Sequence, residues 1–350
     1  MKRVLVDMHR LAKNKFNGLY IYSQHLGEEL INQKPEDIDL YYYLPESILG
    51  HFGNRVQYII QKSFDKYFHR KALGFDIWHS TTTLSWYMPA SKKTKLIFTI
   101  HDVNFLVEHP ELKKSNARYL RLIQKRVDRA DHIIAISAFA LQQARSFLNF
   151  SNKPTTIVYN GCTYITSPPE EKQPSYTPNA PFLFSIGQVL KRKNFHTIIP
   201  LLQNNNYQYV IAGIDNFGYK EIILAEALKY QVTDRVIFTG PISEEEKVWY
   251  YKNCAAFMFP SFAEGFGLPV VEAMYFGKPV FISKEASLPE VGGDVAYYFS
   301  SFDADSMIKD FTNGMLHYNT SDCREKIKAQ AAKFSFKNTA KEIIKIYQSL

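Results

Sequence analysis

Residues 255–283 read AAFMFPSFAEGFGLPVVEAMYFGKPVFIS, and this stretch is the strongest indication of the fold. Its two ends, AAFMFP and PVFIS, are continuous apolar runs, which is typical of strands buried on both faces of a sheet. Between them, Pro269 suits the first turn of a short helix over residues 270–276, and Gly277 ends that helix. Two buried strands joined by a helix predict a parallel α/β unit.

Similar apolar or aromatic runs recur along the chain, six in each half. The predicted strands are RVLVDM (3–8), DLYYYL (39–44), DIWHS (76–80), KLIFTIHD (95–102), HIIAIS (132–137), TTIVYN (155–160), PFLFSIG (181–187), YQYVIAG (207–213), RVIFTG (235–240), AAFMFP (255–260), PVFIS (279–283) and AYYFS (296–300). Amphipathic segments such as 115–130 and 219–229 separate them. Strands that alternate with helices predict an α/β fold with two doubly wound, Rossmann-like domains.

The boundary between these domains is predicted at SPPEEKQPSYTPNAP (167–181), which holds five prolines and little periodicity. We therefore predict a first domain over residues 1–166, a linker over 167–180 and a second domain over 181–335. Open α/β sheets bind ligands outside the carboxyl ends of their strands. Two such domains facing each other would form a deep cleft, so we expect the site to draw on loops from both.

Composition limits the class of protein. With 350 residues, 46% of them hydrophobic and 22% charged, the chain is long enough for two globular domains. It has no run of about 18 apolar residues, and its N-terminus resembles a strand, so we expect neither a spanning helix nor a signal peptide. Cys162, Cys254 and Cys323 form no CxxC pair, which favours the reduced cytoplasm. The net charge of +8 favours an anionic partner, and leaves nucleotide, nucleic acid and acidic membrane surface open.

Two glutamates, Glu264 and Glu272, flank the start of the helix in the opening stretch. A helix N-terminus is an anion site, because its first N–H groups have no partner within the helix and the helix dipole is positive there. The N–H groups expected to face an anion are those of Phe266, Gly267 and Leu268. Gly265 and Gly267 would let the backbone approach a ligand closely. Phosphate at the helix and sugar hydroxyls at the carboxylates would fit a nucleotide sugar; alternatively, the glutamates only stabilise the helix dipole.

The stretch SFAEGFGLPVVEAMYFGKPV (261–280) resembles the Glu-x7-Glu signature of the retaining, family 4 glycosyltransferases of the GT-B fold, also called glycosyl transferases group 1. Further blocks resemble that family in the same order: FTIHDVNFL (98–106), RADHIIAISAFA (129–140), IVYNG (157–161), GQVLKRKN (187–194), VIFTGPISEEE (236–246) and SLPEVGGDVA (287–296). The resemblance extends to bacterial mannosyltransferases. It implies two Rossmann-like domains facing across a cleft, an acceptor domain over residues 1–166 and a nucleotide-sugar donor domain over residues 181–335. It also implies a C-terminal helix, 336–350, that crosses back to the first domain.

The resemblance also implies roles for charged residues of the second domain. Glu264 would position the sugar hydroxyls, and Glu272 would hold the nucleotide ribose. Lys193 and Arg192, in the loop after the first strand of this domain, would neutralise the departing diphosphate. Many relatives carry arginine where this chain has Gln188. Either Arg192 would do more of this work here, or the diphosphate would be held less tightly. Alternatively, Glu264 would act as a covalent nucleophile, as in retaining glycosidases.

Further candidates lie elsewhere in the predicted cleft. His101, at the end of the strand 95–102, matches the family's His-Asp block and would lie near the sugar's reactive face and the acceptor. Its neighbour Asp102 is predicted to cap the following loop. Gly18 resembles the glycine of the family's N-terminal loop, which approaches the donor phosphate, and Ile242 would contact the nucleotide base.

Two Asp-x-Asp patterns, at 37–39 and 303–305, are of the kind that binds a metal together with a diphosphate. The first precedes a predicted strand, and the second resembles the cap of a following helix. Neither lies beside the two glutamates in the strand order. We therefore predict no metal and no cofactor.

Residues 54–73 are predicted to form a basic, aromatic helix. Its apolar face would consist of Ile60, Phe64, Tyr67 and Phe68, and its basic face of Lys62, Lys66 and Arg70. Such a helix suits a membrane surface, and it equally suits packing on the sheet of its own domain.

The expected reaction is a retaining transfer of a sugar from a nucleotide-sugar donor to a hydroxyl of a glycan or lipid-linked acceptor, in bacterial polysaccharide or glycoconjugate synthesis. GDP-mannose is the favoured donor and a UDP-sugar the alternative, and we expect no nucleic acid partner. The expected place is the cytoplasm, with peripheral contact at the inner face of the cytoplasmic membrane. Two other functions stay open: a nucleotide-sugar epimerase of similar shape, which needs no acceptor, and a basic nucleic-acid-binding protein.

Overall fold

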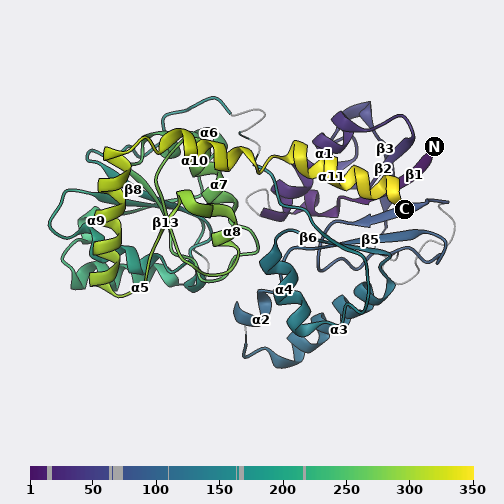
Figure 1. The fold of residues 1–350 in the computed structure, drawn as a ribbon, viewed down its shortest axis with the longest axis horizontal. Coiled ribbons are helices and arrows are strands. Elements are labelled where there is room, and N and C mark those ends of the chain that lie inside the picture. Colours follow the sequence, from purple (N-terminus) through teal and green to yellow (C-terminus); the bar gives the residue numbers. More distant parts are fainter. Residues whose placement is uncertain are drawn as a thin grey trace. The chain divides into compact units, whose positions relative to one another are not determined.

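The predicted strands form two parallel sheets, one in each of two units of the chain (Figure 1). The computed structural model describes residues 1–13, 18–62, 65, 74–108, 110–162, 164, 169–215 and 218–350. Unit 1 comprises Met1–Gly161 and Ser335–Leu350, and unit 2 comprises Cys162–Phe334. Both units are α/β and Rossmann-like, which confirms the predicted fold class.

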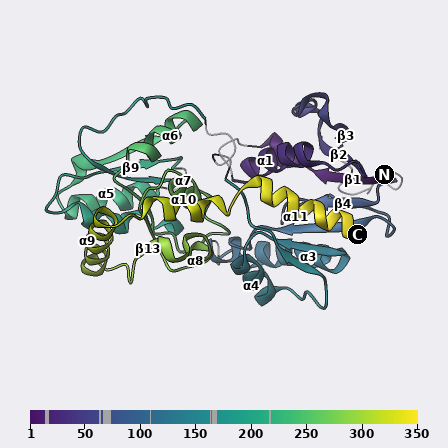
Figure 2. The same cartoon turned by 45° about the horizontal axis from the view of Figure 1, so that its top comes forward.

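Within the described residues, the sheet of unit 1 has seven parallel strands in the order β3-β2-β1-β4-β5-β6-β7. They are β1 (Lys2–Asp7), β2 (Ile38–Pro45), β3 (Gln57–Gln61), β4 (Ile77–Ser80), β5 (Lys95–Ile100), β6 (His132–Ala135) and β7 (Thr155–Ile157). The helices are α1 (Gly18–Gln33), α2 (Phe105–Glu108), α3 (Lys113–Arg129), α4 (Ala138–Phe147) and α11 (Phe336–Ser349), with short 3₁₀ helices η1 (His9–Ala12), η2 (Glu46–Ile48) and η3 (Gly53–Arg55). Helices α1 and α11 pack on one face of this sheet, and α3 and α4 pack on the other (Figures 1 and 2).

The sheet of unit 2 has six parallel strands in the described residues, in the order β10-β9-β8-β11-β12-β13. They are β8 (Phe182–Ile186), β9 (Gln208–Ala212), β10 (Val236–Gly240), β11 (Ala256–Phe259), β12 (Val280–Ile282) and β13 (Tyr297–Tyr298). The helices are η6 (Lys191–Lys193), η7 (Phe195–Leu202), α5 (Tyr219–Lys229), η8 (Thr233–Arg235), α6 (Glu244–Asn253), α7 (Leu268–Tyr275), α8 (Leu288–Gly292), η9 (Gly293–Val295), α9 (Ala304–Thr320) and α10 (Arg324–Ala332). Helices η7, α5 and α9 share one core with the sheet.

In each sheet the chain winds outward from a central strand and then returns to the other side of that strand. The reversal lies between β1 and β4 in unit 1, and between β8 and β11 in unit 2. Open α/β sheets bind ligands at such a switch point, outside the carboxyl ends of the strands. The topology therefore marks one place in each unit where side chains are positioned for binding.

Residues 57–61 form the strand β3, so the helix predicted over residues 54–73 is wrong in this part. The strand pairs in parallel with β2. Its sequence, QYIIQ, has tyrosine and β-branched residues that favour strands, and the ladder to β2 outweighs the helical spacing of the apolar side chains. Ile60 and Lys62 are therefore not on a helix. The other residues of the two predicted faces, Phe64, Lys66, Tyr67, Phe68 and Arg70, lie outside the described residues.

Residues 169–180, predicted as part of the linker, form no helix or strand and lie against unit 2. The carbonyl of Tyr176 accepts a hydrogen bond from the Tyr250 hydroxyl at 2.6 Å, and its own hydroxyl accepts one from Gln208 at 3.1 Å. These contacts hold the segment on unit 2, so the chain changes unit between Gly161 and Cys162.

The C-terminal helix α11 belongs to unit 1. This confirms the prediction that helix 336–350 returns to the first domain. It packs on α1 and shares the main core of the unit. The buried imidazole of His79, on β4, lies 2.6 Å from the Tyr347 hydroxyl of α11 and 2.8 Å from Oγ1 of Thr99. A Cβ atom at Gly161 would lie 1.9 Å from the backbone nitrogen of Phe336, so only glycine fits where the helix begins.

We expect the chain to lose stability when the pH falls below the ordinary histidine pKa of 6.5. Burial lowers the pKa of His79 to about 3 and that of His101 to about 4. Between those values and 6.5 the unfolded chain binds more protons than the folded chain, so the free energy of unfolding falls as the pH falls. One pKa unit is worth about 1.4 kcal/mol, and each of the two pKa values is lowered by more than one unit, so we expect a loss of at least about 3 kcal/mol on acidification through this range. Urea unfolding at stepped pH measures it.

The variant His79→Gln is expected to be less stable than the native chain at neutral pH and to lose less stability on acidification. His317→Gln, at an exposed position of α9, is the matched control and should keep the native pH dependence. The assignment of a neutral, buried His79 is contradicted if the pH dependence is the same in both variants.

Candidate active site

The carboxyl ends of β8 and β11 bring four side chains of unit 2 together. Glu264, in the loop between β11 and α7, accepts three hydrogen bonds at its Oε1 atom. The donors are Lys193 Nζ at 2.6 Å, Ser261 Oγ at 2.7 Å and Arg192 Nη1 at 2.9 Å. Lys193 and Arg192 lie on η6, just after β8. The switch point of unit 2 thus joins the predicted catalytic glutamate to the predicted phosphate-binding cations.

The central ion pair of this cluster is buried, with Glu264 9% exposed and Lys193 5% exposed. Burial alone would raise the pKa of the Glu264 carboxyl, but the charges of Lys193 and then Arg192 outweigh it, so the pKa is lowered. The carboxylate is therefore ionised at neutral pH. All three hydrogen bonds from the described residues go to Oε1, which leaves Oε2 able to accept a hydrogen bond from a ligand.

Gly187 leaves space for the side chain of Lys193 at the carboxyl ends of the strands. Gly187 has a φ of +144°, and a Cβ atom there would lie 3.2 Å from Cε of Lys193. The Nζ atom of Lys193 also lies 4.4 Å from the centre of the Phe259 ring, which is a cation–π contact. Arg192 is fixed as well, because its Nη1 atom donates to the Ala263 carbonyl at 2.9 Å. Both cations are therefore held in place before any ligand binds.

The loop that carries Glu264 leads into the N-terminus of α7. Gly267 is the N-cap residue with a φ of +98°, and a Cβ atom there would lie 2.7 Å from Cδ2 of Leu288. The ring of Phe266 packs against Phe334 with the ring centres 5.5 Å apart. The predicted donor-binding residues Gly265, Phe266, Gly267 and Leu268 all lie in this stretch. The positive end of α7 is thus fixed next to the Glu264 loop.

Glu272, in the middle of α7, belongs to a separate buried ion pair. Its Oε1 atom accepts from Lys247 Nζ at 3.0 Å, and its Oε2 atom accepts from the Tyr251 hydroxyl at 2.8 Å. Lys247, from α6, also pairs with Glu244 at 2.8 Å. Burial raises the pKa of the Glu272 carboxyl, and Lys247 offsets this only in part. Glu272 therefore holds α6 against α7, and its contact with a ribose stays a prediction.

His101 lies in unit 1 at the carboxyl end of β5 and is 6% exposed. Its Nε2 atom lies 2.8 Å from the carbonyl of Thr81, which can only accept, so Nε2 carries the proton. Its backbone N–H donates to Oγ1 of Thr83 at 2.8 Å. With its lowered pKa, the imidazole is neutral at pH 7. Asp102 accepts from the N–H of Asn104 at 3.0 Å, which confirms its predicted role as a loop cap.

Two more predicted residues lie next to helix starts. Gly18 is the first residue of α1, and the loop before it, 14–17, lies outside the described residues. Ile242 is half-buried in the connection between β10 and α6. The contacts of Gly18 with the donor phosphate and of Ile242 with the base stay predictions.

The aspartates of the two Asp-x-Asp patterns make local contacts. Asp303 caps α9 by accepting from the N–H of Ser306 at 2.9 Å, as predicted for a helix cap. Asp39 accepts from the hydroxyl of Tyr41 at 2.7 Å. In the part of the chain that the structure describes, no group of three or more His, Cys, Asp or Glu side chains could hold a metal ion. Nor does any helix there have the length and apolarity needed to cross a membrane.

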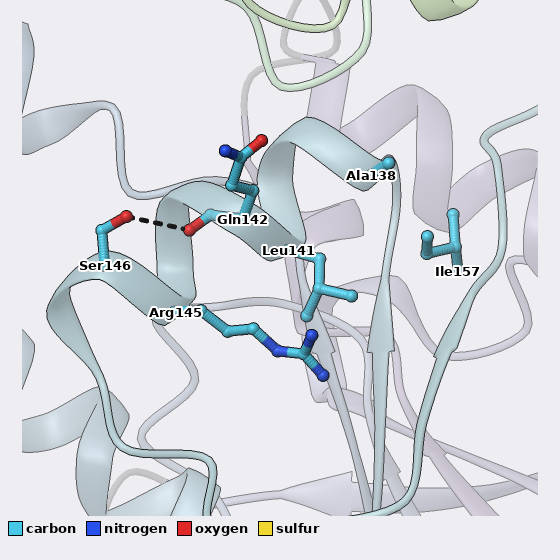
Figure 3. A pocket seen from close by; sticks show the side chains of 6 residues that line it. All are labelled: Ala138, Leu141, Gln142, Arg145, Ser146 and Ile157. Carbon is cyan, nitrogen blue, oxygen red and sulfur yellow. Dashed lines mark hydrogen bonds between the residues drawn. The ribbon is translucent and has the colours of Figure 1, made fainter.

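A surface cavity of about 320 Å³ lies on unit 1 between α4 and β7 (Figure 3). It is lined by Ala138, Leu141, Gln142, Arg145, Ser146 and Ile157. Figure 3 shows Leu141 and Ile157 on either side of the hollow, with the guanidinium of Arg145 below them. The lining includes no carboxylate and none of the predicted site residues, so the chemistry of the candidate site lies elsewhere.

Comparisons with known protein families match both units of the chain. The family described as Glycosyltransferase Family 4 matches residues 17–163, and the family described as Glycosyl transferases group 1 matches residues 168–334. The two matches cover almost the whole chain. The chain belongs to the family 4 glycosyltransferases of the GT-B fold.

One relative of this glycosyltransferase is the O-antigen chain mannosyltransferase B of Escherichia coli, which is 25% identical over 281 residues, or 76% of this chain and 73% of the relative. Among solved structures, the sucrose-phosphate synthase from Thermosynechococcus elongatus matches with a TM-score of 0.75 at 16% identity, over 100% of this chain and 99% of that chain. HepE from Anabaena, in complex with UDP and glucose, matches with a TM-score of 0.69 at 17% identity, over 100% of both chains. At these identities the structures establish the fold.

The sequence-based prediction does not include three residues that contact the two glutamates. Ser261 contacts Glu264, and Lys247 and Tyr251 contact Glu272. Ser261 lies three residues before Glu264 in the same loop, and this short spacing allows a local contact between the two side chains. Lys247 and Tyr251 have no such signal, because their contacts with Glu272 arise only when α6 packs on α7.

Proposed function

We propose that this glycosyltransferase moves a sugar, with its anomeric configuration retained, from a nucleotide-sugar donor to a hydroxyl of a glycan or lipid-linked acceptor in bacterial polysaccharide or glycoconjugate synthesis. The observation that carries the proposal is the buried Glu264 carboxylate bound by Lys193 and Arg192 beside the start of α7. A carboxylate suited to sugar hydroxyls thus lies next to two cations and a helix N-terminus suited to phosphate. The similarity to an O-antigen mannosyltransferase supports the role in polysaccharide synthesis.

In the proposed reaction, the barrier is the separation of charge between an oxocarbenium-like sugar and the departing diphosphate. Lys193 and Arg192 would stabilise the diphosphate, whose charge grows only as the bond breaks. Glu264 would hold the sugar hydroxyls through Oε2 and stabilise the positive charge on the ring. The departing phosphate would take the proton of the acceptor hydroxyl, so the reaction needs no covalent step on Glu264.

GDP-mannose is the proposed donor, with a UDP-sugar as the alternative. The support is the similarity to a mannosyltransferase. The test is to incubate the chain with GDP-mannose, UDP-glucose or UDP-galactose and a panel of free and lipid-linked glycans, and to determine the new linkage by NMR. We expect one donor to give an α-linked product. A β-linked product from these α-configured donors would contradict retention, and conversion of the donor without any acceptor would favour the epimerase.

We expect transfer to persist in excess EDTA. In the proposed mechanism, Lys193, Arg192 and the N-terminus of α7 supply the positive charge that a diphosphate-bound metal supplies in other enzymes. Initial rates with and without the chelator measure this. Complete loss of activity that Mg²⁺ or Mn²⁺ restores would show that the reaction depends on a metal.

Peripheral contact with the inner face of the cytoplasmic membrane is part of the same proposal, because a lipid-linked acceptor is held at a membrane. Helix α3 offers a surface for it. Its exposed basic side chains at helical spacing are Lys114, Arg118, Arg121 and Lys125. Next to them, Trp86 is 40% exposed, and the guanidinium of Arg118 lies 5.6 Å from the centre of its ring. A basic stripe beside an exposed aromatic ring suits anionic lipid headgroups.

Sedimentation with phosphatidylglycerol vesicles tests this contact. We expect the charge reversals Arg118→Glu and Arg121→Glu together to reduce vesicle binding at least about tenfold, since each basic residue near an anionic surface is worth about 1 kcal/mol. The matched control reverses Lys337 and Lys341, which are exposed on α11 of the same unit. Equal losses in the two double variants would contradict a specific role for α3.

A further inference from the structure

Strand β7 forms an open edge of the sheet of unit 1, because it pairs only with β6 in the described residues. The N–H of Val158 donates to the carbonyl of Ala135, which lies opposite Ile157 in the register, at 2.9 Å. Residues that bond to the neighbouring strand alternate along a parallel ladder, so the backbone groups of Thr155 and Ile157 face away from β6. No hydrogen bond in the described residues uses these groups. They can therefore pair with an added strand.

The surface cavity of unit 1 lies beside this edge, between β7 and α4 (Figure 3). Leu141 of α4 and Ile157 of β7 lie on either side of it, and the guanidinium of Arg145 lies below them. Ile157 is 37% exposed, so the cavity is open to solvent at the edge strand. The cavity thus combines apolar walls with a cation, next to backbone groups that are free to donate and accept.

The charge of this cavity is uncompensated. Of the described residues that line it, only Arg145 carries a charge, and it forms no ion pair in the described part of the chain. Its guanidinium is positioned 5.7 Å from the centre of the Phe150 ring. The stretch 145–161, which includes β7, contains no aspartate or glutamate. A second copy of this edge would therefore bring no carboxylate to Arg145, and an acidic partner fits better.

We propose that β7 and the cavity beside it bind an extended segment of a partner protein, which carries an apolar side chain and a carboxylate two positions apart. The segment would add a strand to the sheet through the backbone groups of Thr155 and Ile157. Side chains two positions apart lie on the same face of a strand, so both would face α4. The apolar side chain would fill the space between Leu141 and Ile157, and the carboxylate would pair with Arg145.

This surface goes beyond the proposed function, because it lies along the side of the sheet and shares no residue with the Glu264 cluster. An anionic lipid headgroup would satisfy Arg145, but it would leave the backbone N–H and C=O groups of the edge without partners. An extended chain satisfies both, which is why the geometry selects a peptide.

Two variants separate the backbone contact from the charge. Ile157→Pro removes an N–H that has no partner in the described residues, and an edge strand tolerates proline where its N–H faces outward, so the melting temperature should stay native. Arg145→Glu reverses the charge at an exposed position in the last turn of α4 and should also fold normally. Lys337→Glu, at an exposed position of α11, is the control for the loss of positive charge.

The probe is a peptide selected from a phage library of randomised seven-residue segments on the immobilised full chain. We expect the enriched peptides to carry an apolar residue and an aspartate or glutamate two positions apart. Selection on Arg145→Glu should replace this acid with lysine or arginine. The proposal is overturned if the native chain enriches no sequence, or if the native chain and Arg145→Glu enrich the same sequences.

Fluorescence anisotropy then measures the affinity of one enriched peptide, synthesised unmodified and with N-methyl groups on either alternate set of backbone nitrogens. We expect Arg145→Glu and Ile157→Pro each to weaken binding at least about fivefold, as for a lost hydrogen bond, and Lys337→Glu to bind as the native chain does. One of the two methylated peptides should bind the native chain at least about fivefold more weakly, because it lacks the donors that face β7.

Equal affinity of the unmodified peptide for all variants, or of all three peptides for the native chain, would overturn the proposal. If Ile157→Pro melts below the native chain, the methylated peptides make the same test without any substitution. Light scattering checks the remaining occupant. A native dimer that Arg145→Glu or Ile157→Pro converts to a monomer would show that a second copy covers this edge, and would overturn the assignment to a partner segment.

Discussion

Replacing Glu264 with glutamine is expected to lower the turnover number about 10²-fold or more, which is the loss seen when one preorganised electrostatic group is removed from an active site. Glutamine keeps the size of the side chain and one acceptor oxygen, but it removes the charge that would fix the sugar and stabilise the developing cation. It also leaves Lys193 and Arg192 without their shared anionic partner. Steady-state kinetics with saturating donor measure the effect.

Two other glutamates serve as controls for this variant. Glu285→Gln, at an exposed position of the same unit, should leave turnover and donor KM unchanged. Glu272→Gln should mainly raise the donor KM, because a ribose is bound alike in the ground and transition states. Because Glu272 is also paired with Lys247, the Glu272→Gln variant can be less stable than the native chain. The melting temperatures of the two proteins must therefore be compared. If Glu264→Gln and Glu272→Gln raise the donor KM equally and leave turnover unchanged, the proposed division of roles is wrong.

The second large effect is expected for Lys193→Ala, which should lower the turnover number roughly 10²–10³-fold. The affinity of this variant for the free nucleoside should equal that of the native chain. The reason is that charge on the diphosphate grows only as the sugar leaves, so the cation stabilises the transition state more than the bound donor. Kinetics of transfer and calorimetry with the nucleoside measure the two quantities.

Lys191→Ala is the matched control, because Lys191 lies on the same 3₁₀ helix and is exposed. We expect it to keep most of the native turnover. A turnover number for Lys193→Ala equal to that of Lys191→Ala would remove Lys193 from the mechanism.

The sequence predicts the sheets well, because continuous apolar runs such as FLFSI at 182–186 are long enough to be recognised without their neighbours. It does not predict β3, since QYIIQ lies in a stretch with helical spacing and becomes a strand only by pairing with β2. The placement of Glu264 near Lys193 follows from the rule that carboxyl ends of parallel strands share one edge.

Other features of the site need the folded structure. The sequence does not show that Glu264 receives three hydrogen bonds at one oxygen, because these depend on the exact path of η6 past β11. It likewise gives no sign that Glu272 pairs with Lys247, since α6 and α7 are brought together only by tertiary packing.

In the proposed function, the Glu264 cluster of unit 2 receives the diphosphate of a nucleotide sugar. Isothermal titration calorimetry with GDP, UDP and the matching nucleosides, on the native chain and on the double variant Arg192→Ala/Lys193→Ala, tests it most directly. We predict that one of the two diphosphates binds the native chain, and that the double variant binds it at least about tenfold more weakly while nucleoside binding is unchanged, because charged hydrogen bonds are worth about 1.5–3 kcal/mol each. Equal binding of the diphosphate by the native chain and the double variant, or no binding of either diphosphate to the native chain, would contradict the claim.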